Sequence, residues 1–174
     1  ISFPTKNPVL KNMVSGSCGA SDMRAFIISL HEKGIFVIGR ITTFQNPYYT
    51  KLHADEAVQK KGGGIWTDFK GLAFVDVGAK PYWDSVVALG TEAFTQMGFD
   101  ELNFDYVRFP SDGPMAEAVY SWDSGKKKQE VLEEFFAYLS SHLREVHSGD
   151  YSPVLSADLF GMSATNYDDL SIGQ

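Results

Sequence analysis

The sequence predicts an α/β fold built around parallel strands, and three observations support this class. Segments with helical periodicity alternate with short apolar strands along the chain. The long connecting segments all follow strands, whereas the returns from helix to strand are short. Polar residues gather toward the carboxyl end of each predicted strand. Long loops at those ends are typical of a (β/α)8 barrel, although a doubly wound open sheet would show the same asymmetry.

Three helices are expected, each with a recognisable start and stop. The first covers 21–33, where Ser21 and Asp22 can cap its start and Gly34 ends it. The second covers 81–97, with Pro81 in the first turn and a glycine after its last residue. The third covers 126–146 and has the strongest pattern, with apolar residues at helical spacing. These apolar residues are Val131, Leu132, Phe135, Phe136, Leu139 and Leu143.

Three strands are expected, over 35–42, 99–109 and 154–160. Side chains alternate across a strand, and the apolar face must meet the helices. In the middle strand Leu102 and Phe104 form that apolar face, so the alternate residues point to the other side. Applied to all three strands, this test assigns the inward face to Arg40 and Thr42, to Asn103 and Asp105, and to Ser156 and Asp158. The sequence therefore predicts one polar site at the carboxyl ends of the strands.

Two long loops, over 45–80 and 111–125, follow the first two strands. Neither contains a Gly-x-Gly-x-x-Gly or a Gly-Lys-Ser/Thr motif, so nucleotide binding is disfavoured. Trp66, Asp76 and Trp122 lie on these loops and could form a platform for a sugar, because aromatic faces suit the apolar faces of sugar rings. Packing within the core or the loops is the alternative for each of them.

Composition narrows the classes of ligand. The chain of 174 residues has 15 basic and 22 acidic side chains and a net charge of −7, which disfavours nucleic acid. An acidic, aromatic-rich chain suits a neutral polar ligand such as a sugar. Its histidines lack metal-ligand spacing and its single cysteine, Cys18, excludes an intrachain disulfide, so we expect neither a metal site nor a disulfide. No apolar run reaches the about 18 residues that span a membrane.

One stretch of the chain resembles a known family. Residues 98–113, with Phe-Asp-Tyr-Val-Arg-Phe-Pro over 104–110, resemble the signature of a bacterial family of glycosyl hydrolase domains, distantly similar to the α-amylase barrels. Further similar segments lie at 31–41, 66–76, 155–161 and 172–174. The resemblance covers nearly the whole chain in the same order.

The resemblance implies that residues 1–174 form a single partial (β/α)8 TIM-barrel domain, truncated at both ends, with about strands three to five and their helices. It also implies a glycoside hydrolase that acts on a polysaccharide with two carboxyl groups and no cofactor. Asp105 matches by location the nucleophile at the end of strand four. Asp158 matches the general acid on strand five, although amylases have Glu there. We expect the full-length protein to be secreted or to lie in the cell envelope.

The other expected site residues surround this pair. Arg40 would hold Asp105 ionised by its opposite charge. Tyr106 and Arg108 follow Asp105, and either a ligand-binding or a structural role suits them; Arg108 could pair with Asp112. With Asn103, Trp66 and Asp76 they complete the expected substrate-binding set. Two alternatives stay open, a non-catalytic carbohydrate-binding or cell-envelope barrel and a metal-dependent barrel hydrolase.

Overall fold

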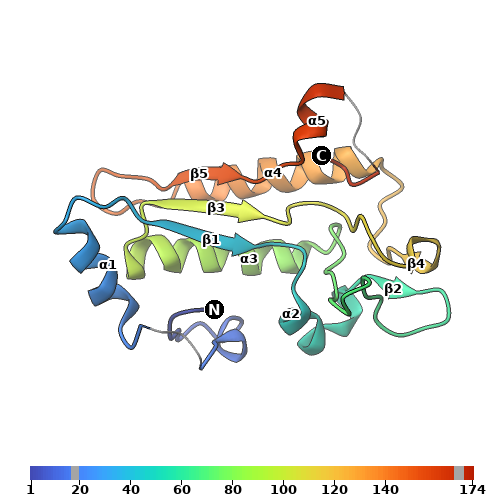
Figure 1. The fold of residues 1–174 in the computed structure, drawn as a ribbon, viewed down its shortest axis with the longest axis horizontal. Helices are drawn as coiled ribbons and strands as arrows, with labels where there is room; N and C mark the ends of the chain where they lie inside the picture. The colour runs from blue at the N-terminus through green and yellow to red at the C-terminus, as the bar shows by residue number, and fades with distance from the viewer. Residues whose placement is uncertain (17–19, 167–170) are drawn as a thin grey trace.

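A computed structural model describes residues 1–16, 20–166 and 171–174, without the side chain of Asn166; Cys18 lies outside this part. Its centre is a parallel sheet with the strand order β1-β3-β5. Helices α3 and α4 pack together along one face of this sheet (Figure 1). The expected α/β class with a parallel sheet is therefore confirmed. The main elements are α1 (Met23–His31), β1 (Ile38–Thr42), α3 (Lys80–Glu92), β3 (Glu101–Asp105), α4 (Lys128–Arg144) and β5 (Val154–Ala157).

Shorter elements occupy the long connections. They are η1 (Lys11–Met13), α2 (Pro47–Leu52), η2 (Ala54–Glu56), β2 (Gln59–Lys60), η3 (Ala93–Met97), η4 (Met115–Glu117), β4 (Ala118–Val119) and α5 (Gly161–Asn166). Helix α2 lies inside the expected loop 45–80, although its start signal was present: Asn46 caps the backbone N–H of Tyr49 at 3.0 Å, and Pro47 follows. Helix α5 comes directly after the third expected strand.

All three strands of the sheet are shorter than predicted. β3 ends at Asp105 rather than at residue 109, because Tyr106 has a φ of 51° and turns the chain out of the strand. β1 begins at Ile38 rather than at residue 35, where β3 offers it no partner. Just before β1, the Val37 N–H instead donates to the side chain of Asp100 at 2.7 Å.

The two faces of the sheet differ in burial as the alternation predicts. Leu102 and Phe104 are fully buried on the helix side. A Cβ on Gly90 of α3 would lie 3.2 Å from the side chains of both Leu102 and Leu143, so the helices approach the sheet closely here. On the opposite face Ile38 and Val154 are exposed. The predicted facing of β3 is confirmed, and its polar face lies open in the described part of the chain.

The two long excursions meet beyond the carboxyl ends of the strands (Figure 1). β2 pairs with β4 in an antiparallel ladder, which ties the excursion after β1 to the one after β3. The buried carboxylate of Asp76 strengthens this link, because it accepts the backbone N–H of Gly78 and that of Trp122, each at 3.0 Å. These loops therefore form one packed layer at the end of the sheet where the polar residues lie.

Candidate active site

Asp105 is the last residue of β3, and both of its carboxylate oxygens have partners. Oδ2 accepts a hydrogen bond from Arg40 Nη2 of β1, and Oδ1 accepts the backbone N–H of Tyr106 at 2.7 Å. The Asp105 side chain keeps 20% of its surface exposed and that of Arg40 keeps 56%, so the ion pair is open to solvent. The structure thus brings Arg40 and Asp105 together on the face away from the helices.

Asp158 directly follows β5 and lies next to Asp105 across the sheet. Phe104 pairs with Ala157 in the ladder, and the Asp158 N–H donates to the Phe104 carbonyl at 2.9 Å. The side chain of Asp158 is exposed and accepts a hydrogen bond from Asn103 Nδ2 at 3.2 Å. Neighbouring residues of parallel strands in this register point to the same face, so the two carboxyl groups open onto one surface.

Two further residues extend this polar surface. The Ser156 hydroxyl accepts from Asn103 Nδ2 at 3.1 Å and donates to the carboxylate of Glu101. Sequence reasoning placed Glu101 on this face but gave it no role in the site. The signal was the alternation itself, which puts Glu101, Asn103 and Asp105 on one side of β3. The polar face therefore carries two groups of contacts, the Arg40–Asp105 pair over β1 and β3 and the Glu101–Ser156–Asn103–Asp158 chain over β3 and β5.

Arg108 is buried near Asp105, and its described hydrogen bonds are with Phe109 and Ser111. Its Nη1 donates to the Phe109 carbonyl at 3.0 Å and to the Ser111 hydroxyl at 2.9 Å. Its guanidinium lies 5.1 Å from the centre of the Tyr106 ring and 4.8 Å from that of Phe160. Burial lowers the pKa of Arg108.

The described residues do not form the ion pair that we considered between Arg108 and Asp112. Arg108 instead donates a hydrogen bond to Ser111. Tyr106, in its left-handed conformation, holds Asp105 by its N–H and faces Arg108 with its ring. For Tyr106 and Arg108 the sequence left a ligand-binding and a structural role open. Their described contacts are with other residues of the fold, which suits the structural role.

Two of the three residues expected to form a sugar platform, Trp66 and Asp76, are buried. Trp66 is fully buried, and its indole N–H donates to the Pro114 carbonyl at 3.0 Å. Asp76 is also buried, and this burial raises its pKa. Trp122 is exposed, but its indole N–H is bound to the Asp55 carbonyl at 2.9 Å. Trp66 and Asp76 are therefore packed inside the protein, which is the alternative to a sugar platform that the sequence left open.

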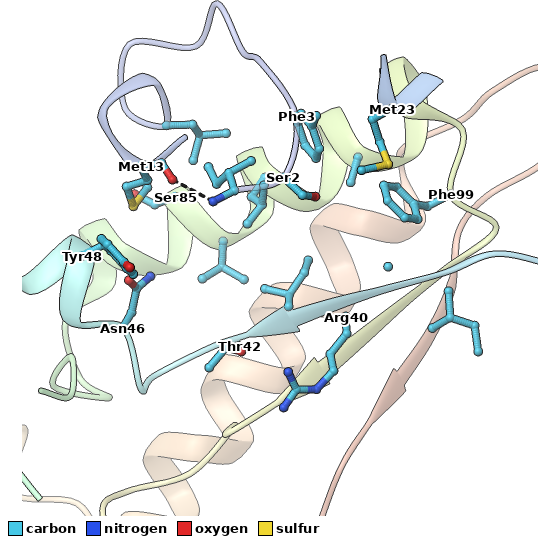
Figure 2. A pocket seen from close by; sticks show the side chains of 18 of the residues that line it. Ser2, Phe3, Met13, Met23, Arg40, Thr42, Asn46, Tyr48, Ser85 and Phe99 are labelled. Atoms are coloured by element: carbon cyan, nitrogen blue, oxygen red, sulfur yellow. Dashed lines mark hydrogen bonds between the residues drawn. The ribbon is translucent and has the colours of Figure 1, made fainter. Parts of the chain in front are cut away.

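A cavity of about 620 Å³ lies on the other side of β1, between the N-terminal segment and α3. Apolar side chains such as Phe3, Met13 and Phe99 line it. Figure 2 shows the Arg40 side chain leaving β1 on the side away from these residues. Arg40 nevertheless lines this cavity as well as the polar site, whereas Glu101, Asp105 and Asp158 are not among the residues that line it.

The described part of the chain contains neither a cluster of metal-binding side chains nor a membrane-spanning helix. Its residues include no group of three or more His, Cys, Asp or Glu side chains placed to hold a metal ion. Nor does this part contain a helix with the length and apolar character required to cross a bilayer. The charged groups gathered on the open face of the sheet are the carboxylates and the guanidinium of Arg40.

Comparison with solved structures places the chain among glycosidase-like folds. A hypothetical protein from Ruminiclostridium thermocellum ATCC 27405 is 30% identical, with a TM-score of 0.78 over 92% of this chain and 77% of that one. Alpha-L-fucosidase isoenzyme 2 from Paenibacillus thiaminolyticus is 14% identical, with a TM-score of 0.57 over 83% of this chain and 24% of that one. The cycloalternan-degrading enzyme from Trueperella pyogenes is 14% identical, with a TM-score of 0.55 over 90% and 24%.

The two enzymes share the fold with this chain, which spans about a quarter of their length. No protein with a curated function matched the chain. A family model matched all of residues 1–174. The chain therefore belongs to the family DUF4015, whose description is "Putative glycosyl hydrolase domain".

Proposed function

We propose that this domain contributes the catalytic carboxyl pair of a glycoside hydrolase that acts on a polysaccharide. Asp105 is the nucleophile or base in this proposal, and Asp158 is the general acid. The observation that carries it is the placement of both carboxyl groups side by side at the strand ends, each open to solvent and each with a different partner. Glycoside hydrolysis needs such a pair, with one carboxylate and one proton donor.

The different partners suit the two roles. Arg40 supplies a positive charge beside Asp105, whereas Asp158 is held by the neutral amide of Asn103. A cation favours negative charge on a neighbouring carboxylate, and a neutral amide does so less.

We also propose that the sheet continues into a (β/α)8 barrel, of which residues 1–174 form one part. In the described residues β1 and β5 each pair with β3 alone, so both outer edges are available for further strands. An apolar cavity follows the edge of β1, and a second one of about 450 Å³, lined by residues such as Phe136 and Leu155, follows β5. Unpaired edges beside apolar grooves are where additional strands and helices would pack.

The family description and the glycosidase-like fold support this function, and the activity itself would belong to the full-length protein. The test is to incubate that protein with a panel of α- and β-linked polysaccharides and to measure released reducing ends. Asp105→Asn and Asp158→Asn should each lower the rate by about 10²–10⁴-fold. Asp150→Asn, a change of an exposed carboxylate before β5, is the control and should keep the wild-type rate.

A specific negative result would overturn the proposal. Equal rates in the wild type and in Asp105→Asn would remove Asp105 from the mechanism. Binding of a polysaccharide without hydrolysis, unchanged by either substitution, would favour the non-catalytic carbohydrate-binding barrel instead.

A further inference from the structure

Phe69 is 79% exposed, an unusual environment for a phenylalanine in a well-packed part of the chain. Its neighbour Asp68 is buried, and Trp66 is buried as well. A large apolar side chain gains free energy when it leaves water, so a rigidly exposed one is a candidate contact for a partner molecule. The conformation of the surrounding turn shows that this exposure is built into the fold.

Asp68 anchors the turn that carries Phe69. Its Oδ1 accepts the backbone N–H of Lys70 and that of Leu72, each at 2.8 Å. The turn closes with a hydrogen bond from Gly71 N–H to the Asp68 carbonyl at 3.0 Å, and Gly71 has a φ of 76°. Because the backbone on both sides of Phe69 is fixed in this way, binding at the ring requires little ordering of the main chain.

The same turn is joined to the ends of the two strands that carry Arg40 and Asp105. Gln45, which follows β1, donates to Asp68 Oδ2 at 3.1 Å. After β3, Gly113 packs so closely that a Cβ on it would lie 2.9 Å from Asp68 Cα. The turn that carries Phe69 therefore belongs to the layer of loops that follows β1 and β3, the strands of Arg40 and Asp105.

We propose that the Phe69 ring is a stacking platform for a pyranose ring of the substrate, at a subsite away from the cleaved bond. This inference rests on the proposed glycosidase function and deepens it, because it names a residue that would bind the polysaccharide away from the cleaved bond. A neutral pyranose presents an apolar C–H face that matches an exposed phenyl ring, and it leaves the charged groups near Asp105 for the reacting sugar. The ring takes the platform role that the buried Trp66 does not have.

The test is binding of oligosaccharides of two and six units, from both maltose and cellobiose series, to the full-length protein carrying Asp105→Asn. Phe69→Ala should weaken binding of the six-unit ligand by about tenfold, as the loss of one aromatic stacking contact implies. Phe69→Trp should preserve it, and binding of the two-unit ligand should not change. Tyr151→Ala is the matched control, because Tyr151 is 77% exposed but precedes β5 at the opposite end of the sheet.

The proposal would be overturned if Phe69→Ala bound the six-unit ligand as tightly as the parent protein, which carries Asp105→Asn alone. It would also be overturned if Phe69→Ala and Tyr151→Ala lost the same amount of affinity. Failure of the parent protein to bind any six-unit ligand would also overturn it. The platform and the proposed catalysis fail separately: a protein that hydrolyses nothing but loses binding with Phe69→Ala keeps the platform and refutes the catalytic pair.

Discussion

Asn103 lies on the same face of β3 as Asp105, two residues earlier in the strand. Its side chain reaches the neighbouring strand, where Nδ2 donates a hydrogen bond to Asp158 Oδ1 at 3.2 Å. The same amide also donates to Ser156 at 3.1 Å. One residue of the strand that carries the proposed nucleophile thus positions the proposed acid on the neighbouring strand. If this relationship serves catalysis, its loss should change the chemical step more than substrate binding.

Asn103→Ala is therefore expected to lower kcat by up to ~10²-fold, the cost of a misplaced catalytic group, with KM little changed. The control is Ser156→Ala, which leaves the bond between Asn103 and Asp158 intact and should lower kcat much less. Steady-state kinetics on a hydrolysed polysaccharide measure both. Equal losses in the two variants would mean that Asn103 acts through the general packing of the sheet.

Arg40 offers a second test, because one substitution removes its positive charge and another keeps it. Arg40→Gln should lower kcat/KM on the order of 10²-fold by removing the charge beside Asp105, whereas Arg40→Lys should retain more activity. Both should change the free energy of unfolding by less than about 1 kcal/mol, since the pair is open to solvent. Denaturant titrations accompany the kinetics. Wild-type activity in Arg40→Gln would show that the ion pair has no part in the reaction.

Gly113 tests how the loop layer is held together. It has a φ of 110°, and a Cβ there would lie 2.7 Å from Trp66 Cζ2. Gly113→Ala should therefore destabilise the protein by about 1–3 kcal/mol more than Gly125→Ala, because overpacking adds to the backbone strain. Gly125 also has a positive φ, of 73°, but open space around it. Similar melting temperatures for the two variants would contradict the close packing of this loop against Trp66.

Much of this arrangement follows from periodicity in the sequence. The alternation in β3 correctly predicted that Leu102 and Phe104 face the helices, and the same rule placed Asn103 and Asp105 on the open face. Local signals such as Asp22, which caps the N–H of Ala25 at 2.9 Å, located the first helix to within a few residues. These features depend on neighbours in the chain, which a single sequence displays.

Features set by distant contacts could not be predicted in the same way. Trp66 is buried because its indole N–H finds the carbonyl of Pro114 and Gly113 leaves room for its ring, a match between two loops far apart in the sequence. Tyr106 ends β3 early by adopting a left-handed conformation that its residue type does not signal. The turn of Phe69 likewise involves a distant contact, the hydrogen bond from Gln45 to Asp68.

Asp76 makes a prediction for the dependence of stability on pH. Burial raises its pKa above the ordinary value of 3.8, so the native state binds a proton at pH values where the unfolded state has released it. The stability that Asp76 contributes should be greatest below pH 3.8 and should fall as pH rises toward the raised native pKa, then stay level.

Asp76→Asn cannot titrate and supplies the reference. The difference in the free energy of unfolding between wild type and Asp76→Asn, measured by urea titration from pH 3 to pH 7, should decline with rising pH and then level off. A difference that grows with pH would show that the N–H groups of Gly78 and Trp122 lower the pKa more than burial raises it.

The most direct measurement is the activity of the double variant Asp105→Asn/Asp158→Asn beside the two single variants. Residues that act as one catalytic unit show losses that do not add, because removing either one already abolishes the mechanism. If Asp105 and Asp158 share one site, the double variant should retain the same residual rate as the slower single variant. A double variant whose loss equals the product of the two single losses would show that Asp105 and Asp158 act independently, and would contradict a shared site at the ends of β3 and β5.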